Sequence, residues 1–159
     1  MIKISLAVAL SATIASAWFM PSISFGGAGD DSNTHVDKNF VRDDATKLVQ
    51  DTKNAKLYYD AKPSDKMHFF EAWEYCKNMD YQGFDDWRVI TKEEAVSLLE
   101  LSRRQVNVKH AFKNVQEDLY WTSTEDRYEE GWVVDFDLGR YSTKKQTNKY
   151  RVICVTEAK

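Results

Sequence analysis

Two cysteines, Cys76 and Cys154, constrain the fold of this chain more than any other feature of its sequence. They are the only cysteines, and 78 positions separate them. This spacing is far from the CxxC pattern of redox and zinc sites. In an oxidising compartment a lone pair of cysteines forms one disulfide, whereas two buried thiols are the alternative. A bridge that closes so long a loop stabilises the folded state by about 4 kcal/mol in the chain-entropy model. The compartment of the protein therefore decides how the cysteines are interpreted.

The first residues have the pattern of a secretory signal peptide. Lys3 is followed by an uncharged, mostly apolar stretch over residues 4–14, and Ala15-Ser16-Ala17 supplies the small residues that a signal peptidase recognises. A membrane anchor is the alternative, but polar residues interrupt the stretch, and a spanning helix needs roughly 20 predominantly apolar residues. The sequence therefore predicts a cleaved signal peptide over residues 1–17, with no stable membrane insertion afterwards.

Export would place both cysteines in an oxidising compartment. We therefore expect a Cys76–Cys154 disulfide in a periplasmic or secreted protein. Residues 18–39 contain half of the chain's glycines and two adjacent aspartates. Because such a segment has little apolar surface to bury, it is predicted to be a flexible Gly/Asp-rich tether. The folded domain is expected to begin near Phe40.

Composition excludes two classes of protein. Hydrophobic residues make up 43% and aromatic residues 13% of the chain, which is enough for a packed core and excludes disorder throughout. The net charge of −3 argues against a nucleic-acid-binding protein, because such a protein needs a basic excess or stripe.

Two segments have helical patterns. Apolar residues recur at helical spacing after Ser64, which is placed to cap a helix, and they put Cys76 on its buried face. This stripe comprises Phe69, Trp73, Cys76 and Met79. Further along, Thr91 and Glu94 form a capping-box pattern, which predicts a second helix over residues 92–102.

The second half of the chain favours strands. Residues 119–124 are rich in aromatic and β-branched side chains, and the side chains of residues 131–137 alternate between two faces, as in a strand. Leu138-Gly139 has the pattern of a hairpin turn, and residues 150–155 are predicted to form a terminal strand. Early helices and late antiparallel strands predict an α+β domain. Trp73, Trp87, Trp121 and Trp132 are expected in the core, whereas Tyr128 and Tyr141 are better candidates for exposure.

Several segments also match, in order, the motifs of a known family. Phe70–Cys76 resembles its W-x-x-A-x-x-Y-C helix, and Gly83–Thr91 with Glu94 resembles its G-Y-x-D-W-R-L-P-T-x-x-E-L signature. Tyr120–Glu125 resembles its Y-W-S-S-T-E segment. Over residues 40–157 the chain thus resembles the Lcl C-terminal domain family, a bacterial extracytoplasmic module. This chain has Ile90 at the position where the signature has proline, so it differs from the family in the turn chemistry of this loop.

This resemblance implies a C-type-lectin-like fold, with two helices, a mainly antiparallel sheet and a disulfide between the first helix and the last strand. It also implies a function in surface recognition. Adhesins of the family are associated with sulfated polysaccharides, but that property belongs to particular members.

Catalytic motifs are absent from the sequence. It contains no HExxH, GxSxG, P-loop or GxGxxG pattern, and none of its three histidines has another at metal spacing. These are His35, His68 and His110. We therefore expect neither an enzyme nor a cofactor.

An acidic loop is a weak candidate for calcium, which takes oxygen ligands from carboxylates and carbonyls. Its residues are Glu125, Asp126, Glu129 and Glu130. Because the Glu-Pro-Asn and Trp-Asn-Asp signatures of calcium-binding lectins are missing, a solvated loop is the preferred interpretation.

Basic residues gather near the end of the chain and provide a candidate ligand-binding surface. The candidates are Arg140, Lys144, Lys145 and Lys149, with Tyr128 and Tyr141 as exposed aromatic residues. Arg103, Arg104, Lys109, His110 and Lys113 could extend this surface toward an anionic glycan. The alternative is a hairpin edge that lysines protect against aggregation.

The sequence thus predicts an exported recognition module that binds a glycan or cell-surface polymer. A structural or accessory subunit that binds another envelope protein is the alternative. A degenerate enzyme relative is a third hypothesis, which would require a pocket with convergent, perturbed carboxylates.

Overall fold

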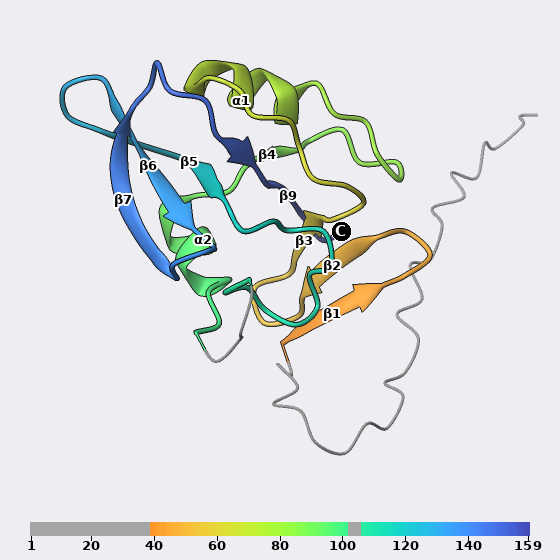
Figure 1. The fold of residues 1–159 in the computed structure, drawn as a ribbon. Helices are drawn as coiled ribbons and strands as arrows, with labels where there is room; N and C mark the ends of the chain where they lie inside the picture. The colour runs from red at the N-terminus through yellow and green to blue at the C-terminus, as the bar shows by residue number, and fades with distance from the viewer. Residues whose placement is uncertain (1–38, 102–105) are drawn as a thin grey trace, which may run out of the picture.

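A computed structural model of the chain describes residues 39–101 and 106–159 (Figure 1). The predicted signal peptide, residues 1–17, lies outside the described residues, as does the predicted tether except for its last residue.

The described chain contains two helices and two sheets. The helices are α1 (Phe69–Lys77) and α2 (Lys92–Ser97). The first sheet has the order β1-β2-β3-β9-β4, and the second has the order β7-β6-β5-β8. The strands are β1 (Phe40–Asp43), β2 (Leu48–Asp51), β3 (Lys56–Tyr59), β4 (Arg88–Val89), β5 (Leu119–Asp126), β6 (Glu130–Asp135), β7 (Arg140–Lys145), β8 (Arg151–Val152) and β9 (Cys154–Glu157). Apart from the parallel β5–β8 pair, neighbouring strands are antiparallel, which confirms the predicted α+β class.

The predicted disulfide joins α1 to the last strand. Cys76 and Cys154 are bonded, with their Cα atoms 5.4 Å apart, and both are buried. Strand β9 lies between β3 and β4, so the bridge fastens α1 to the interior of the first sheet rather than to its edge. The helix-to-last-strand connection expected of a C-type-lectin-like fold is therefore present.

Helix α1 differs from its prediction in two ways. Its buried residues are Phe69, Ala72 and Cys76, whereas Trp73 is 41% exposed. Trp73 follows Ala72 directly, so the helix rotates it by about 100° away from the buried stripe. His68, and not Ser64, is the N-cap. Ser64 is buried instead, where its Oγ accepts a hydrogen bond from the backbone N–H of Val152 at 2.8 Å.

Helix α2 has the predicted capping box but is shorter than predicted. Thr91 Oγ1 accepts from the backbone N–H of Glu94 at 3.2 Å, and Glu94 Oε2 accepts from that of Thr91 at 2.8 Å. The helix ends at Ser97 rather than at residue 102. Its end coincides with a new pairing, because Leu99 forms a β-bridge with Val108.

The predicted terminal strand over residues 150–155 is divided between the two sheets. Its first part, β8, pairs with β5 in the second sheet, and β9 continues in the first. Val152 and Cys154 pack into the core cluster that contains Trp121, whereas Ile153 between them packs into the cluster that contains Phe136. This short segment therefore connects both sheets and both parts of the core.

Two residues within the family-like signature serve the fold. Arg88 donates to both carboxylate oxygens of Glu94, at 2.8 and 2.7 Å, and Lys56 Nζ lies 2.6 Å from Glu94 Oε1. Burial alone would raise the pKa of Glu94, but the hydrogen bonds from Arg88 and Lys56 outweigh it and lower this pKa to about 2. The signature thus ties the start of α2 to β4 and β3.

The buried carboxylate of Asp60 organises a long loop. Asp60 accepts hydrogen bonds from the backbone N–H groups of Lys113 and Asn114, at 2.8 and 3.1 Å, and from Arg42. Burial is the largest influence on the Asp60 pKa and raises it. Because these donors occupy the carboxylate, we interpret Asp60 as a residue that holds residues 113–114 against the end of β3.

Candidate binding surface on the second sheet

The candidate surface is built on β7, the edge strand of the second sheet (Figure 1). In its pairing with β6, Tyr141 lies opposite Val134 and Thr143 lies opposite Trp132. Side chains alternate along a strand, so Tyr141, Thr143 and Lys145 lie on one face of β7. Arg140, Ser142 and Lys144 lie on the other face.

The first of these faces carries a cluster of one lysine and two aromatic rings, which we call the Lys92 cluster. Lys92 Nζ lies 3.3 Å from the ring centroid of Trp132 and 4.9 Å from that of Tyr141. The two rings are 5.9 Å apart and tilted by 55°. An ammonium group in this position is attracted by the negative faces of both rings, which restricts its motion at the protein surface.

Secondary structure fixes all three members of the cluster. Lys92 is the first residue of α2, directly after the capping residue Thr91. Its backbone N–H donates to Thr124 Oγ1 of β5 at 3.1 Å. Trp132 and Tyr141 belong to the paired strands β6 and β7. The ammonium group is therefore presented by a rigid support.

Several basic side chains on β7 and near it form no ion pair with a carboxylate in the described part of the chain. Among residues 39–101 and 106–159, no carboxylate forms an ion pair with Lys92, Lys144, Lys145 or Lys149. Arg140 differs, because its Nε lies 3.5 Å from Asp135 Oδ2.

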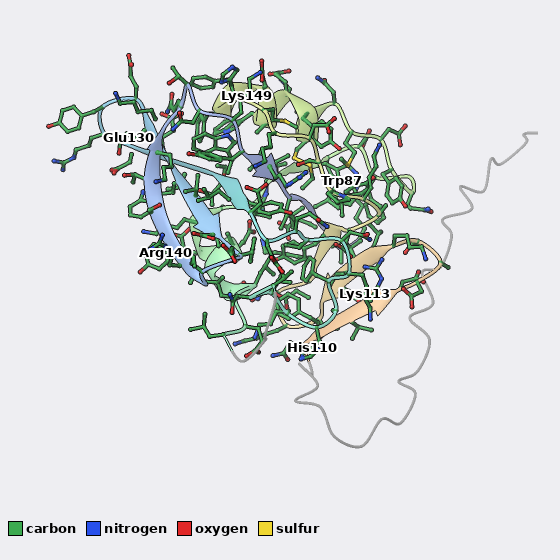
Figure 2. The ribbon with its side chains drawn as sticks, viewed as in Figure 1. Trp87, His110, Lys113, Glu130, Arg140 and Lys149 are labelled. Atoms are coloured by element: carbon green, nitrogen blue, oxygen red, sulfur yellow. A yellow bond between two sulfur atoms is a disulfide. The ribbon has the colours of Figure 1, made fainter. Side chains whose placement is uncertain are left out.

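The structure separates many of the residues that the sequence analysis grouped. Figure 2 shows Lys149 beside α1, Arg140 at the opposite end of the second sheet, and His110 and Lys113 well away from both. Lys109 Nζ lies 3.4 Å from Glu100 Oε2, with which it forms an ion pair. Arg103 and Arg104 fall outside the described residues. The geometry therefore supports a smaller surface around β7 than the predicted basic patch.

Both tyrosine predictions are confirmed, whereas the four tryptophan predictions divide evenly, because Trp73 and Trp132 are not in the core. Tyr128 and Tyr141 are exposed as expected, by 91% and 50%, but Tyr128 belongs to the β5–β6 hairpin loop and not to the Lys92 cluster. Trp87 and Trp121 are buried in the core as predicted. Trp132 is only half-buried, because its ring lies under Lys92 at the surface, and its core assignment was wrong.

The role of Lys92 and the surface position of Trp132, the lysine–indole pair at the centre of the cluster, were not predicted from the sequence. One local signal did exist for Lys92, since the capping box at Thr91 places it in the first turn of a helix, where side chains reach solvent. No comparable signal joins it to Trp132, which lies far along the chain.

The acidic loop does not form a metal cage in this structure. Glu125, Asp126 and Glu129 are exposed, and Glu130 is half-buried. In the part of the chain that the structure describes, no three His, Cys, Asp or Glu side chains gather in a metal-binding arrangement.

A small crevice contains the carboxylate of Asp60, whose pKa is raised by burial. It measures about 10 Å³ and is lined by Asp60, Tyr75 and Tyr120, among others. This volume is at the lower limit for one water molecule. The Tyr120 hydroxyl accepts a hydrogen bond from the backbone N–H of Gln116 at 2.8 Å, so both polar groups already serve the fold.

Comparison with known proteins identifies the family. The family model of the Lcl C-terminal domain matches residues 39–156. This chain belongs to the Lcl C-terminal domain family. The match confirms the family predicted from the sequence motifs, and membership suggests a binding domain rather than an enzyme.

Other comparisons are weaker. The crystal structure of botrocetin is similar with a TM-score of 0.43 and 15% sequence identity, over 65% of this chain and 92% of that chain. No curated protein matches the sequence. Neither of the described helices is long and apolar enough to cross a membrane. The disulfide fits an extracytoplasmic Lcl C-terminal domain.

Proposed function

We propose that this Lcl C-terminal domain is an exported recognition module that binds an anionic polysaccharide along β7. The observation that carries the proposal is a set of lysines around an exposed aromatic ring that form no ion pair with the acidic residues of the described segments. Lys92 and Lys145 lie on the same face as Tyr141, and Lys144 extends the positive charge around the strand edge. The proposed activity requires no cofactor.

Lys92 provides the best-defined anion contact. Its ammonium group is already held over Trp132 and Tyr141, so little side-chain freedom remains to be lost when a sulfate or carboxylate binds. The half-exposed Tyr141 ring offers an apolar face on which a sugar ring can stack. The arrangement thus combines charge recognition with a contact to the carbohydrate itself.

Each exposed charge pair contributes little, and a polymer compensates by making several contacts at once. One exposed ion pair is worth about 0.2–1 kcal/mol. Three lysines acting together therefore contribute about 1.5 kcal/mol, or roughly a tenfold change in affinity. Since these contacts lie at the surface, added salt should weaken them.

The experiment measures binding of the exported chain to heparin, a sulfated polysaccharide, with neutral dextran as the comparison. The test variant is K92Q/K144Q/K145Q. The matched control, K53Q/K62Q/K77Q, makes the same change in net charge at exposed lysines away from β7. We expect salt-sensitive heparin binding that falls roughly tenfold in the test variant only. Absence of binding, or equal loss in both variants, would refute the proposal.

Protection of the β7 edge is the competing explanation for these lysines, because unpaired edge strands promote association between chains. This explanation predicts that K92Q/K144Q/K145Q forms dimers or aggregates, whether or not it binds heparin. Analytical ultracentrifugation of the same two variants separates the explanations, since the polysaccharide proposal predicts that both remain in the wild-type oligomeric state.

A further inference from the structure

A second surface, remote from β7, has the opposite chemical character. A groove with a volume of about 490 Å³ opens between α1, the segment that follows it and β3. Its lining includes Tyr59, Tyr75, Met79 and Tyr81, with the carboxylates of Glu74 and Asp80. The segment that follows α1 extends to the side of the molecule away from β7 (Figure 1).

The aromatic residues of this groove are held in place. The rings of Tyr59 and Tyr81 meet edge to face, with centroids 4.9 Å apart. The Tyr81 hydroxyl donates to the backbone carbonyl of Thr46 at 2.8 Å, and Tyr81 and Phe84 exchange backbone hydrogen bonds across a tight turn. Tyr75 is anchored by α1, next to the disulfide-bonded Cys76. The groove is therefore formed before any partner binds.

The charge of the groove is negative. Of its described lining residues, Glu74 and Asp80 are charged, and none is Lys, Arg or His. Both carboxylates are exposed. Lys62 lines the small adjoining crevice but not the groove. Tyrosine ring faces attract cations, and two nearby carboxylates strengthen this preference.

We propose that this groove binds the guanidinium or ammonium head of a basic side chain that a protein partner presents. A binding site for a small molecule usually encloses most of its ligand, whereas this groove is open along the surface. An open shape suits a side chain that projects from a larger body. The proposal does not depend on polysaccharide binding, and it gives this domain a second surface with its own partner chemistry.

The test is a titration of the exported, isotope-labelled chain with the peptide Ac-Gly-Arg-Gly-NH2, followed by NMR. The same peptide with citrulline in place of arginine is the control, because citrulline keeps the shape of the side chain and removes its charge. We expect the arginine peptide to shift the resonances of Tyr59, Tyr75 and Tyr81 with weak affinity that decreases as salt is added, and the citrulline peptide to leave them unchanged.

Two double variants locate the site. E74Q/D80N removes both groove carboxylates, whereas E125Q/D126N makes the same charge change at exposed residues of β5. We expect the first to weaken arginine-peptide binding by about threefold to tenfold and the second to leave it nearly unchanged. Equal loss in both variants, equal shifts from both peptides, or no shifts at the groove tyrosines would overturn the proposal. Since all four residues are exposed, we expect both variants to have the melting temperature of the wild type.

Discussion

Replacing Glu94 with glutamine tests how the family-like signature supports the fold. E94Q keeps the size of the side chain and the acceptor of the capping box, but it removes the charge that Arg88 and Lys56 share. The carboxyl has a pKa of about 2 in the folded protein, against an ordinary value of 4.5. At roughly 1.4 kcal/mol per pKa unit, the ionised Glu94 stabilises the fold by about 3 kcal/mol.

The sign of the pH dependence follows from the lowered pKa. The contribution of Glu94 is fully present above its unfolded pKa of 4.5, and it is lost as the pH falls through about 2. Urea unfolding of wild type and E94Q should therefore differ by about 3 kcal/mol at neutral pH, and the difference should shrink steadily below pH 4.5.

The neighbouring residue provides the control for this experiment. Glu93 is exposed in the same turn of α2, so E93Q makes the same charge change without the ion pairs. It should alter stability by less than about 0.5 kcal/mol. A loss below about 1 kcal/mol in E94Q, the value of an ordinary surface pair, would refute our reasoning. A loss that stays constant down to the lowest pH would refute it as well.

Two further predictions concern the core. Reducing the disulfide should lower the free energy of unfolding by about 4 kcal/mol, which urea titrations with and without dithiothreitol will measure, and an unchanged midpoint would contradict this contribution. Substituting Gly131 with alanine should destabilise the protein by about 1–3 kcal/mol, because the new Cβ would lie 2.5 Å from Cε2 of the buried Phe69 ring. Wild-type thermal stability in G131A would show that this ring moves at little cost.

Predictions from the sequence succeeded where a local rule or a covalent bond determined the structure. The capping box of Thr91 and Glu94 depends on neighbouring residues, and it is present. The disulfide followed from an argument about the compartment, and it fixes α1 against β9. The end of α2 could not be predicted in this way, because the pairing of Leu99 with Val108 competes with continued helix.

The binding surface shows why the site was harder to predict. Lys144 and Lys145 are adjacent in sequence, yet they lie on opposite faces of β7 because strand side chains alternate. Lys92 and Trp132 are distant in sequence, yet the packing of α2 against β6 places one over the other. The run of basic residues in the sequence therefore pointed to β7, but it could not predict the Lys92 cluster.

The most decisive measurement is chemical-shift mapping of β7 and its neighbours with a short sulfated oligosaccharide. We expect the largest shifts at the Trp132 indole, at Tyr141 and at the neighbouring lysines Lys92 and Lys145, and we expect these shifts to decrease as salt is added. Shifts confined to other parts of the molecule, or no shifts at all, would contradict polysaccharide recognition at β7.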